Sequence, residues 1–389
     1  MFVANRLRPA AAAVRVKPMG VTIRDVAREA GVTPGTVSRA LRGHPQVSEE
    51  CIARVRAVAV RLGYKPLRDR SGRSNPQPLL GKRIAIAMFG IDRTLAGLPV
   101  VAEAIHGAEE ALAEAGAHPI IVNVPDPAEP PRSLRRVKFD GVLAKAAMQG
   151  NVARTFTYRL RLTLGEAPLV WMLGRPTGVA GDVVDPDDAL VGRIAAEAAV
   201  GKGHRRALIV NPKADHALFA IRTAAFRRCM EEHGGAVVEI DRPRASPVSF
   251  PLQPVMDVAE VQPLVDRAVE AMRKGDRDRP TVIFCPADSI AALVYRALAT
   301  RGRVAGRDIS VVSCNNERAL VAGLWPTLAT IDVHPQRIGR LAVEQLARRI
   351  TGQFAGAAVQ IGVAPTFIPG GSLAKCRAAG RPPRRARRR

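Results

Sequence analysis

The sequence is poor in aromatic and in acidic residues. Only 4% of its 389 residues are aromatic, so the cores must be built mainly from alanine, valine, leucine and isoleucine. Asp and Glu together number 35 against 59 Lys and Arg, which leaves a formal net charge of +24. An excess of this size indicates a polyanionic partner, either nucleic acid or an anionic membrane surface.

Three further absences exclude classes of protein. No run of 18 uncharged apolar residues occurs, so we expect no membrane-spanning helix. In the basic, alanine-rich residues 1–19, Arg and Lys interrupt every apolar stretch, which predicts a disordered leader and not a secretion signal. The five cysteines are scattered without a CxxC pair, which favours a reducing cytoplasm over a disulfide framework or a zinc site.

Catalytic and cofactor motifs are also missing. The seven histidines show no HExxH spacing, and no GxSxG elbow is present. Neither GxGxxG after an early strand nor GxxxxGK[ST] occurs, so the dinucleotide and P-loop patterns are absent. We therefore expect no enzymatic activity, no cofactor and no metal.

The positive charge is concentrated at the two ends of the chain. Residues 1–80 carry +10 and residues 375–389 carry +8, which leaves +6 for the 294 residues between them. The tail, residues 374–389, contains Pro and Gly among like charges and is predicted to be disordered. Either it adds sequence-independent affinity for DNA with a steeper salt dependence, or it reflects a coding bias toward arginine.

Residues 20–66 have the start and stop signals of three short helices. Each helix begins at a hydroxyl residue and ends at a glycine, with bounds near Thr22–Gly31, Thr33–Gly43 and Ser48–Gly63. A tight turn joins the first two, and the second has little apolar surface of its own. This arrangement predicts a helix-turn-helix. The alternative is a small solvated helical bundle with no role in DNA binding.

The same segment resembles a known family. TIRDVAREAGVTPGTVSRALRG (22–43), followed by VSEE (47–50) and LGYKP (62–66), is similar to the headpiece of the lac repressor/galactose repressor family. The resemblance implies that the second helix enters the major groove, with Pro34 and Gly35 at the main specificity positions and Arg39 as the base-contacting arginine. Since Pro34 and Gly35 lack polar side chains, we expect Arg39 to be the main reader. The full set of predicted DNA contacts is Thr22, Thr33, Pro34, Gly35, Thr36, Ser38, Arg39, Arg42, Tyr64 and Arg73.

The linker, residues 67–81, departs from the family pattern. The resemblance implies a short hinge helix with a leucine that wedges into the minor groove, but Arg73 stands where that leucine is expected. An arginine can enter a narrow minor groove, yet it cannot separate a base step as an apolar wedge does. We predict that this protein bends its operator less than its relatives do, unless Leu67 replaces the wedge in a shifted register.

From residue 82 onward, short apolar runs alternate with amphipathic stretches. The predicted strands are Ile84–Phe89, Pro119–Val124, Gly141–Ala144, Leu169–Leu173, Asp182–Val184, Ala207–Val210, Val237–Ile240, Val282–Cys285 and Ile309–Cys314. The predicted helices are Val101–Ala115, Ala189–Val200, Ala217–His233, Val258–Lys274, Ser289–Arg301 and Pro335–Ile350. This alternation is typical of parallel sheets covered by helices. Because the length exceeds one doubly wound unit, it indicates two subdomains with a cleft between them.

The family resemblance continues weakly along this body, residues 82–373. VDPDDA (184–189), GHRRAL (203–208), RTAAF (222–226), FCPAD (284–288) and DISVVSCNN (308–316) resemble landmarks of the family's effector-binding domain. The resemblance implies a fold similar to periplasmic sugar-binding proteins, with the chain crossing between two subdomains three times. We therefore predict an α/β protein: an all-α helix-turn-helix headpiece followed by a two-subdomain, periplasmic-binding-protein-like domain with parallel sheets.

The cleft has lost the acidic residues that hold sugar hydroxyls in relatives. Of four positions that the resemblance implies for ligand contact, Arg222 is kept, while Gly174, Ala287 and Asn315 depart and both carboxylates are gone. With Arg175 close in sequence, the cleft is less acidic. The effector is then a sugar acid or sugar phosphate, a neutral ligand held differently, or absent. Asp288 is expected to cap the following helix or contact the ligand. Trp171 packs in the core or stacks on a ligand ring.

Together these observations predict a sequence-specific DNA-binding regulator of transcription, expected to be a repressor, that a small-molecule effector modulates. Its partners would be a near-palindromic double-stranded operator, the effector and a second copy of itself in a homodimer or higher oligomer, without a membrane. It would act in the cytoplasm, on the nucleoid. The rival interpretation is a solute-binding protein or an enzyme that has acquired a basic nucleic-acid-binding arm.

Overall fold

The computed structural model divides into two compact units, residues 1–76 and 77–389, which we describe one at a time. The structure describes residues 21–41, 47–62, 64, 77–91, 98–127, 129, 137–148, 167–176, 178–213, 216–241, 258–271, 279–354 and 356–376. The basic leader, Arg42, Arg73 with linker residues 67–76, and tail residues 377–389 lie outside this part. The predictions made for them are therefore not addressed by the fold.

The described residues of the first unit form three helices, α1 (Ile23–Ala30), α2 (Pro34–Leu41) and α3 (Glu49–Arg61). Their start signals are confirmed. The Asp25 carboxylate accepts from the Thr22 backbone N–H at 2.9 Å, the Thr33 hydroxyl accepts from the Thr36 N–H at 3.1 Å, and the Ser48 hydroxyl accepts from the Cys51 N–H at 3.3 Å. Small apolar side chains fill the space between the helices, namely Val26, Ala27, Ala30, Val37, Ala40, Val55, Val58 and Ala59.

The turn between α1 and α2 depends on one glycine. Gly31 follows α1 with φ of +66°, a left-handed conformation that disfavours any residue with a Cβ. Its N–H, together with that of Val32, bonds back to the last turn of α1. The chain therefore reverses within three residues, and α2 begins immediately afterwards. This is the geometry that the spacing of Gly31 and Thr33 predicts.

The second unit is built on two six-stranded sheets. The first has the order β11-β5-β4-β3-β1-β2, and the second β12-β10-β9-β8-β6-β7. All neighbouring strands are parallel except β12, which runs antiparallel to β10. The strands are β1 (Arg83–Phe89), β2 (His118–Val124), β3 (Gly141–Ala146), β4 (Leu169–Met172), β5 (Asp182–Pro186), β6 (Arg206–Asn211), β7 (Ala236–Asp241), β8 (Val282–Phe284), β9 (Ser310–Asn315), β10 (Ala329–Asp332), β11 (Gln360–Val363) and β12 (Thr366–Ile368).

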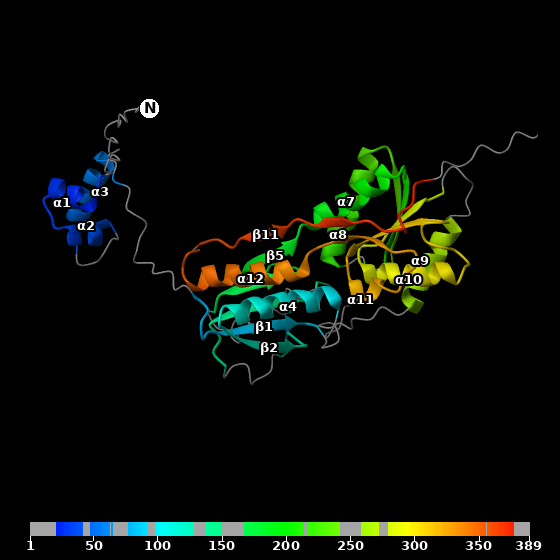
Figure 1. Cartoon of the computed structure of the whole chain (residues 1–389), viewed down its shortest axis with the longest axis horizontal. Helices are drawn as coiled ribbons and strands as arrows, with labels where there is room; N and C mark the ends of the chain where they lie inside the picture. Colours follow the sequence, from blue (N-terminus) through cyan, green and yellow to red (C-terminus); the bar gives the residue numbers. More distant parts are fainter. Residues whose placement is uncertain are drawn as a thin grey trace, which may run out of the picture. The chain divides into compact units, whose positions relative to one another are not determined.

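Helices cover these sheets as Figure 1 shows. Their bounds are α4 (Pro99–Glu114), α7 (Asp188–Gly201), α8 (Ala217–Glu232), α9 (Val258–Ala271), α10 (Asp288–Ala299), α11 (Arg318–Val321) and α12 (Pro335–Ile350). Helices α4 and α12 pack side by side on one face of the first sheet. Helices α7 and α8 cover one face of the second sheet, and α9 and α10 cover the other. The predicted parallel, helix-covered architecture is confirmed.

The chain crosses between the sheets three times. It leaves the first sheet after β5 and enters the second through α7 and β6. It returns from β10 through α12 to β11, and it crosses again in the short step from β11 to β12. Two subdomains therefore share three connections, as the family resemblance implied. No helix in the described part of the chain is long and apolar enough to cross a membrane.

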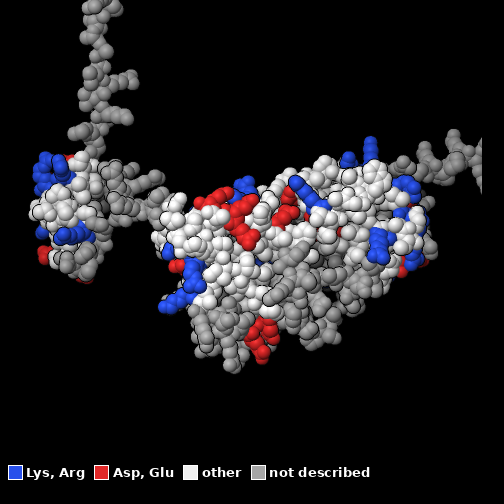
Figure 2. All heavy atoms as spheres, turned by 60° about the horizontal axis from the view of Figure 1, so that its bottom comes forward, with Lys and Arg blue, Asp and Glu red and all other residues white. Residues whose placement is uncertain are grey.

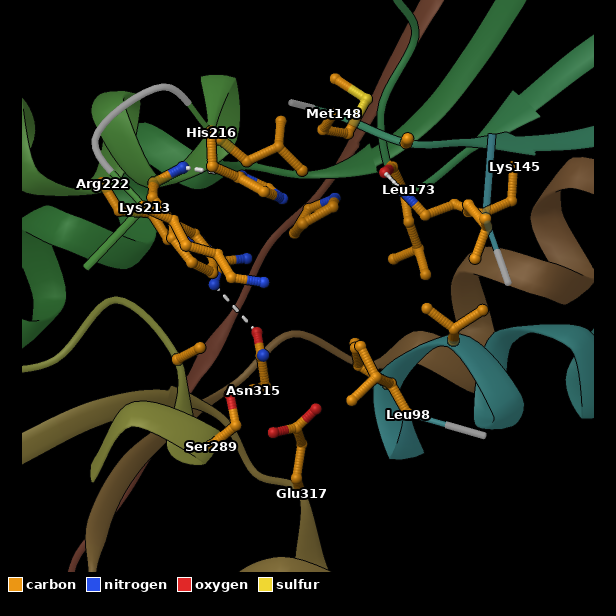
Figure 3. A pocket seen from close by; sticks show the side chains of 18 of the residues that line it. Leu98, Lys145, Met148, Leu173, Lys213, His216, Arg222, Ser289, Asn315 and Glu317 are labelled. Atoms are coloured by element: carbon orange, nitrogen blue, oxygen red, sulfur yellow. Dashed lines mark hydrogen bonds between the residues drawn. The ribbon is translucent and has the colours of Figure 1, made fainter. Parts of the chain in front are cut away.

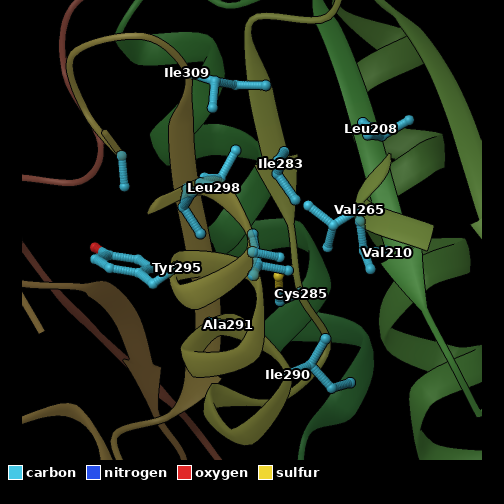
Figure 4. Close-up of a cluster of buried hydrophobic side chains, with 14 of the residues drawn as sticks. Leu208, Val210, Val265, Ile283, Cys285, Ile290, Ala291, Tyr295, Leu298 and Ile309 are labelled. Carbon is cyan, nitrogen blue, oxygen red and sulfur yellow. The ribbon is translucent and has the colours of Figure 1, made fainter. Parts of the chain in front are cut away.

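Aliphatic side chains take the place of aromatic ones in the core on one face of the second sheet. Figure 4 shows aliphatic side chains of the strands meeting those of α9 and α10. Leu208, Val210, Ile283 and Val265 are fully or almost fully buried there, and Tyr295 at the edge donates its hydroxyl to the Pro326 carbonyl at 3.0 Å. Parallel strands buried on both faces need such continuous aliphatic runs, which explains why the sequence shows runs and not alternation.

Candidate functional site

Helix α2 presents a polar face to solvent. The residues of this face that the sequence predicts to contact DNA are exposed or half-buried, namely Thr33, Pro34, Gly35, Thr36, Ser38 and Arg39. Arg39 is exposed in the last turn of the helix. A fork of N–H donors in this place suits bidentate contact with a base edge or a phosphate.

Four of the predicted DNA contacts have structural roles of their own. The Thr22 hydroxyl donates to the Asp25 carboxylate at 2.6 Å, which closes the start of α1. The Thr33 and Thr36 hydroxyls hydrogen-bond each other at 2.9 Å, while Thr33 also caps α2. Tyr64 is half-buried against the helical core. These threonines and Tyr64 therefore hold the shape of the three-helix unit, whatever else they touch.

On one face of the second unit, the charged side chains of the described residues lie in small groups. On the face that Figure 2 shows, most of this unit is uncharged, and Lys/Arg and Asp/Glu form small separate groups. Several of the cations are paired in place, such as Arg340 with Glu110 and Glu114. This agrees with the modest charge of the middle of the sequence.

The second unit contains a cavity of about 130 Å³ between its two sheets. It lies where the strands end, because its lining includes residues at or just after the carboxyl ends of β1, β3, β4, β5, β6 and β9. The first turns of α4, α8 and α10 complete it. Ligands of parallel α/β sheets bind at this edge, and helix N-termini there favour negative charge. Figure 3 shows the side chains converging from both sheets.

Lys145 lies at the end of β3 in this cavity. Its side chain is buried, and its Nζ donates to the carbonyls of Ala146 at 2.9 Å and Leu173 at 2.7 Å. Burial lowers the pKa of Lys145 to about 8, although nearby Asp185 and Asp188 oppose the shift. An ammonium group has three donors, so one remains for a ligand.

Glu317 faces the cavity from the other sheet, directly before α11. It is only 2% exposed, and its Oε2 has no hydrogen-bond partner among the described residues. Burial, reinforced by the nearby Asp288 carboxylate, raises the pKa of Glu317 to about 7, while backbone N–H groups of Val100 and Ser289 partly oppose this. Glu317 therefore has one carboxyl oxygen, Oε2, without a hydrogen-bond partner among the described residues, and its side chain belongs to the cavity lining.

Arg222 is held by three partners inside the protein. Its Nε donates to Asp188 at 2.6 Å, and its Nη1 donates to the Pro286 carbonyl and to the Asn315 side chain, each at 2.9 Å. The guanidinium still reaches the cavity, where the Nη2 hydrogens remain for a ligand. His216, at the start of α8, is a neutral neighbour, because burial and the nearby cations hold its pKa well below the ordinary value.

The structure brings together some of the residues that the sequence predicts for effector binding and not others. Arg222, Ala287 and Asn315 line the cavity. Trp171, Gly174, Arg175 and Asp288 are not part of its lining. The Trp171 ring is fully buried, and its Nε1 donates to the Ala180 carbonyl at 2.9 Å, so of its two expected roles the structure shows core packing.

Arg175 and Asp288 form contacts away from the cavity. Arg175 donates to the Gly181 carbonyl at 2.7 Å. The expectation that Asp288 caps α10 is wrong, because Ala287 occupies the cap position. Asp288 instead accepts from the Thr330 hydroxyl at 2.7 Å and from the Glu317 N–H at 2.8 Å. It therefore fixes the segment that carries Glu317.

Gly174 adopts a conformation that requires glycine, with φ of +109°. A Cβ there would lie 2.6 Å from the Met148 sulfur, and Met148 lines the cavity. The position where the resemblance implies a ligand-holding aspartate is therefore backbone only. A thioether occupies the adjoining space, so the polar contact has been replaced by an apolar one.

The sequence alone did not identify several cavity residues. Lys145, Lys213, His216 and Glu317 belong to the lining, and each lies at or after a strand end or beside the start of a helix. A search for polar residues directly after each predicted strand would have found Lys145, whereas Lys213 lies three residues after the predicted strand. Glu317 precedes a helix of a single turn, which has no sequence signal of its own. Within the described residues, no cluster of three His, Cys, Asp or Glu residues could hold a metal ion.

Comparisons with known proteins agree with this division. Residues 22–66 match the family described as "Bacterial regulatory proteins, lacI family", and residues 196–373 match the "Periplasmic binding protein-like domain". The chain is 26% identical to the ribose operon repressor of Escherichia coli (strain K12) over 337 residues, which cover 85% of this chain and 93% of that protein. It is 28% identical to the HTH-type transcriptional regulator GntR of Pseudomonas aeruginosa over 338 residues, 85% and 90% of the two chains.

Solved structures show the same fold. The transcriptional regulator CelR in complex with cellobiose matches with a TM-score of 0.59 at 21% identity, over 90% of this chain and 99% of that one. The lac repressor dimer bound to operator and the anti-inducer ONPF matches with a TM-score of 0.56 at 19% identity, over 92% and 100%. At this identity the likeness is one of architecture.

Proposed function

This chain belongs to the lacI family of bacterial regulatory proteins, and from this premise we propose that it binds an operator sequence-specifically and that a small molecule in the cavity between its sheets changes that affinity. The observation that carries the proposal is the polar, exposed face of α2, with Arg39 in its last turn, within the segment that matches the family. The relatives that match along most of the chain are regulators of transcription and not enzymes.

The assembly follows from how such a unit reads DNA. One headpiece covers one half-site, so a near-palindromic operator needs two copies of the chain. We propose a homodimer or higher oligomer that acts on the nucleoid in the cytoplasm, where chromosomal DNA lies, and that represses transcription. The lac repressor relative is a dimer on its operator, which supports the same arrangement here.

Effector coupling is proposed to act through the cavity. Both sheets contribute to its lining, so a ligand that contacts Lys145 on one side and Arg222 on the other binds best when the two subdomains have one particular spacing. A ligand can shift such an equilibrium only by its differential affinity for the two arrangements. The coupling therefore depends on ligand contacts with both subdomains at once.

The experiment that tests DNA reading compares two arginines of the headpiece. An operator is first selected from random DNA with the full chain. Arg39→Ala is expected to reduce the preference for this operator over scrambled DNA by about 10- to 100-fold, because one bidentate arginine–guanine contact contributes about 1–3 kcal/mol. Arg56→Ala removes the same charge from the exposed side of α3 and should retain the preference. Equal binding of the unmodified protein to operator and scrambled DNA would overturn the proposal.

The linker and tail predictions extend this proposal to segments outside the described residues. A bend-angle measurement on the bound operator tests the linker, and a sharp central kink would contradict the weak bending expected with Arg73 in the wedge position. Deletion of residues 377–389 tests the tail. A smaller slope of log affinity against log salt is expected, and an unchanged slope would assign the tail to compositional bias.

A further inference from the structure

Most of the residues that line the cavity are apolar. Of the nineteen residues that line it, twelve are apolar. Leu98, Met148, Leu173 and Phe219 provide the larger surfaces, and they come from four separate segments of the chain. A sugar has a hydroxyl on almost every carbon, and each hydroxyl buried against hydrocarbon loses hydrogen bonds to water without replacement. The lining therefore favours a ligand with an apolar body.

Seven polar side chains complete the lining, namely Lys145, Lys213, His216, Arg222, Ser289, Asn315 and Glu317. Ala287 and Gly174 offer no polar side chain where the family resemblance implies ligand contacts. Lys145 keeps a third donor and Arg222 its Nη2 hydrogens for a ligand, while Oε2 of Glu317 has no partner among the described residues. Three of the seven side chains are cations, so the set favours an anionic group on the ligand.

The charged groups around the cavity favour an anionic ligand. Asp188 pairs with Arg222, and Asp185 interacts with Lys145, so these carboxylates partly neutralise the positive charge of both cations. The first turns of α4, α8 and α10 add only the partial positive charge of helix N-termini. Lys213 is a third cation in the lining and lies close enough to act on His216. The set of groups therefore favours an anion over a neutral ligand.

In this arrangement of the subdomains, the cavity fits a small apolar body. About 130 Å³ is close to the roughly 150 Å³ of an engineered apolar cavity that binds benzene in another protein. We propose that the effector is a small organic monocarboxylate whose hydrocarbon body is about the size of one six-membered ring. Its carboxylate contacts Lys145 or Arg222, and a hydroxyl or other donor on the body, where present, contacts Glu317. The inference rests on the proposed regulatory function and names the ligand class of the same cavity.

The first experiment uses the unmodified full chain and isothermal titration with a matched panel. Benzoate, 4-hydroxybenzoate and cyclohexanecarboxylate carry the proposed features. Benzyl alcohol keeps the ring without the charge, gluconate keeps the carboxylate on a polyol, and glucose and glucose 6-phosphate complete the comparison. At least one ring carboxylate is expected to bind tenfold or more tightly than all four comparison compounds. Tighter binding of any of those four, or no ring carboxylate binding at millimolar concentration, would overturn the inference.

The second experiment asks whether the carboxylate is held at Lys145. Lys145→Met keeps the length and apolar part of the side chain, and it should weaken binding of the best ring carboxylate at least tenfold while leaving benzyl alcohol unaffected. Lys202→Met, on the exposed end of α7, is the matched control and should change neither. Equal loss for carboxylate and alcohol would contradict a charge contact. If Lys145→Met does not fold, the ligand panel with the unmodified chain decides.

Operator binding of the same preparation separates the two proposals. If the protein binds its operator specifically but binds no ring carboxylate, only the proposed ligand class is refuted. If it does not bind an operator specifically, the regulatory function is refuted, whatever binds in the cavity. If the protein binds both the operator and a ring carboxylate, adding the carboxylate should change the operator dissociation constant, and Lys145→Met should reduce that change.

Discussion

Arg222 and Asp188 form a buried ion pair that joins α8 to the first residue of α7. The distance from Nε to Oδ1 is 2.6 Å, and both side chains are about 5% exposed or less. Arg222 also donates to a carbonyl before α10 and to the last residue of β9, so one guanidinium connects four segments of the chain. The residue that resemblance assigns to the ligand is therefore first a structural group, and its orientation does not depend on a ligand.

Asp188→Asn should destabilise the second unit strongly. The substitution leaves a buried guanidinium without its counter-charge, a loss that typically costs about 3–5 kcal/mol. Glu197→Gln removes one partner of an exposed ion pair with Arg193 on the same helix, and should change stability by less than about 1 kcal/mol. Thermal unfolding followed by circular dichroism measures both. Similar melting temperatures for the two variants would show that the buried pair does not contribute as argued.

The long elements of the fold could be predicted because their signals are local. Helix α12 has the predicted bounds, since Pro335 stands at its first position and an apolar stripe runs to Ile350. Strands β10, β11 and β12 were missed. They contain three or four residues each, and their pairing with β9, β5 and β10 comes from distant parts of the chain, so no local pattern marks them.

The site was less predictable than the fold for a physical reason. Arg222 was found by resemblance, but its neighbours in the cavity come from distant strand ends, and its partner Asn315 is 93 residues away in sequence. Which side chain at a strand end faces the cavity depends on the register of both sheets. Trp171, at the end of β4, faces the core, whereas Leu173 two residues later lines the cavity. The sequence can therefore predict that a residue lies at the sheet edge next to the cavity, but it does not determine whether the side chain points into the cavity or into the core.

Gly339→Ala should separate two helices that touch through their backbones. A Cβ at Gly339 of α12 would collide with the Ala104 carbonyl of α4, and one at Gly107 of α4 would collide with the Gln336 carbonyl of α12. Neither obstacle is a flexible side chain, so the helices must move apart, at a cost of about 1–3 kcal/mol or more. Chemical denaturation of the full chain measures the loss.

Gly201→Ala is the matched control for this substitution. Gly201 ends α7, and a Cβ there meets nothing within 4 Å. Alanine should therefore be neutral or stabilising by about 0.5–1 kcal/mol, because it restricts the unfolded chain. Destabilisation of both variants to the same extent would indicate that the loss at Gly339 is not caused by helix contact.

Glu317→Gln should change how stability depends on pH. Burial raises the pKa of Glu317 from 4.5 to about 7, so the folded protein holds this proton more tightly than the unfolded chain does. The resulting stabilisation is complete below pH 4.5 and is lost as pH rises through 7. Over this window the loss is on the order of 3 kcal/mol at most, at about 1.4 kcal/mol for each pH unit. The nearby Asp288 carboxylate adds to the rise in the pKa of Glu317, and Arg222 opposes it.

Glutamine removes this titration while keeping an oxygen for the Val100 and Ser289 N–H groups and an amide for the cavity. The variant should be no more stable than the unmodified protein at pH 5 and clearly more stable at pH 8, a difference that melting temperatures at the two pH values measure. Glu197→Gln, on the exposed side of α7, controls for the loss of one carboxylate. A difference between variant and unmodified protein that stays constant from pH 5 to 8 would mean that Glu317 is ionised throughout, and the unsatisfied Oε2 would then require a resident cationic or donor partner in the cavity.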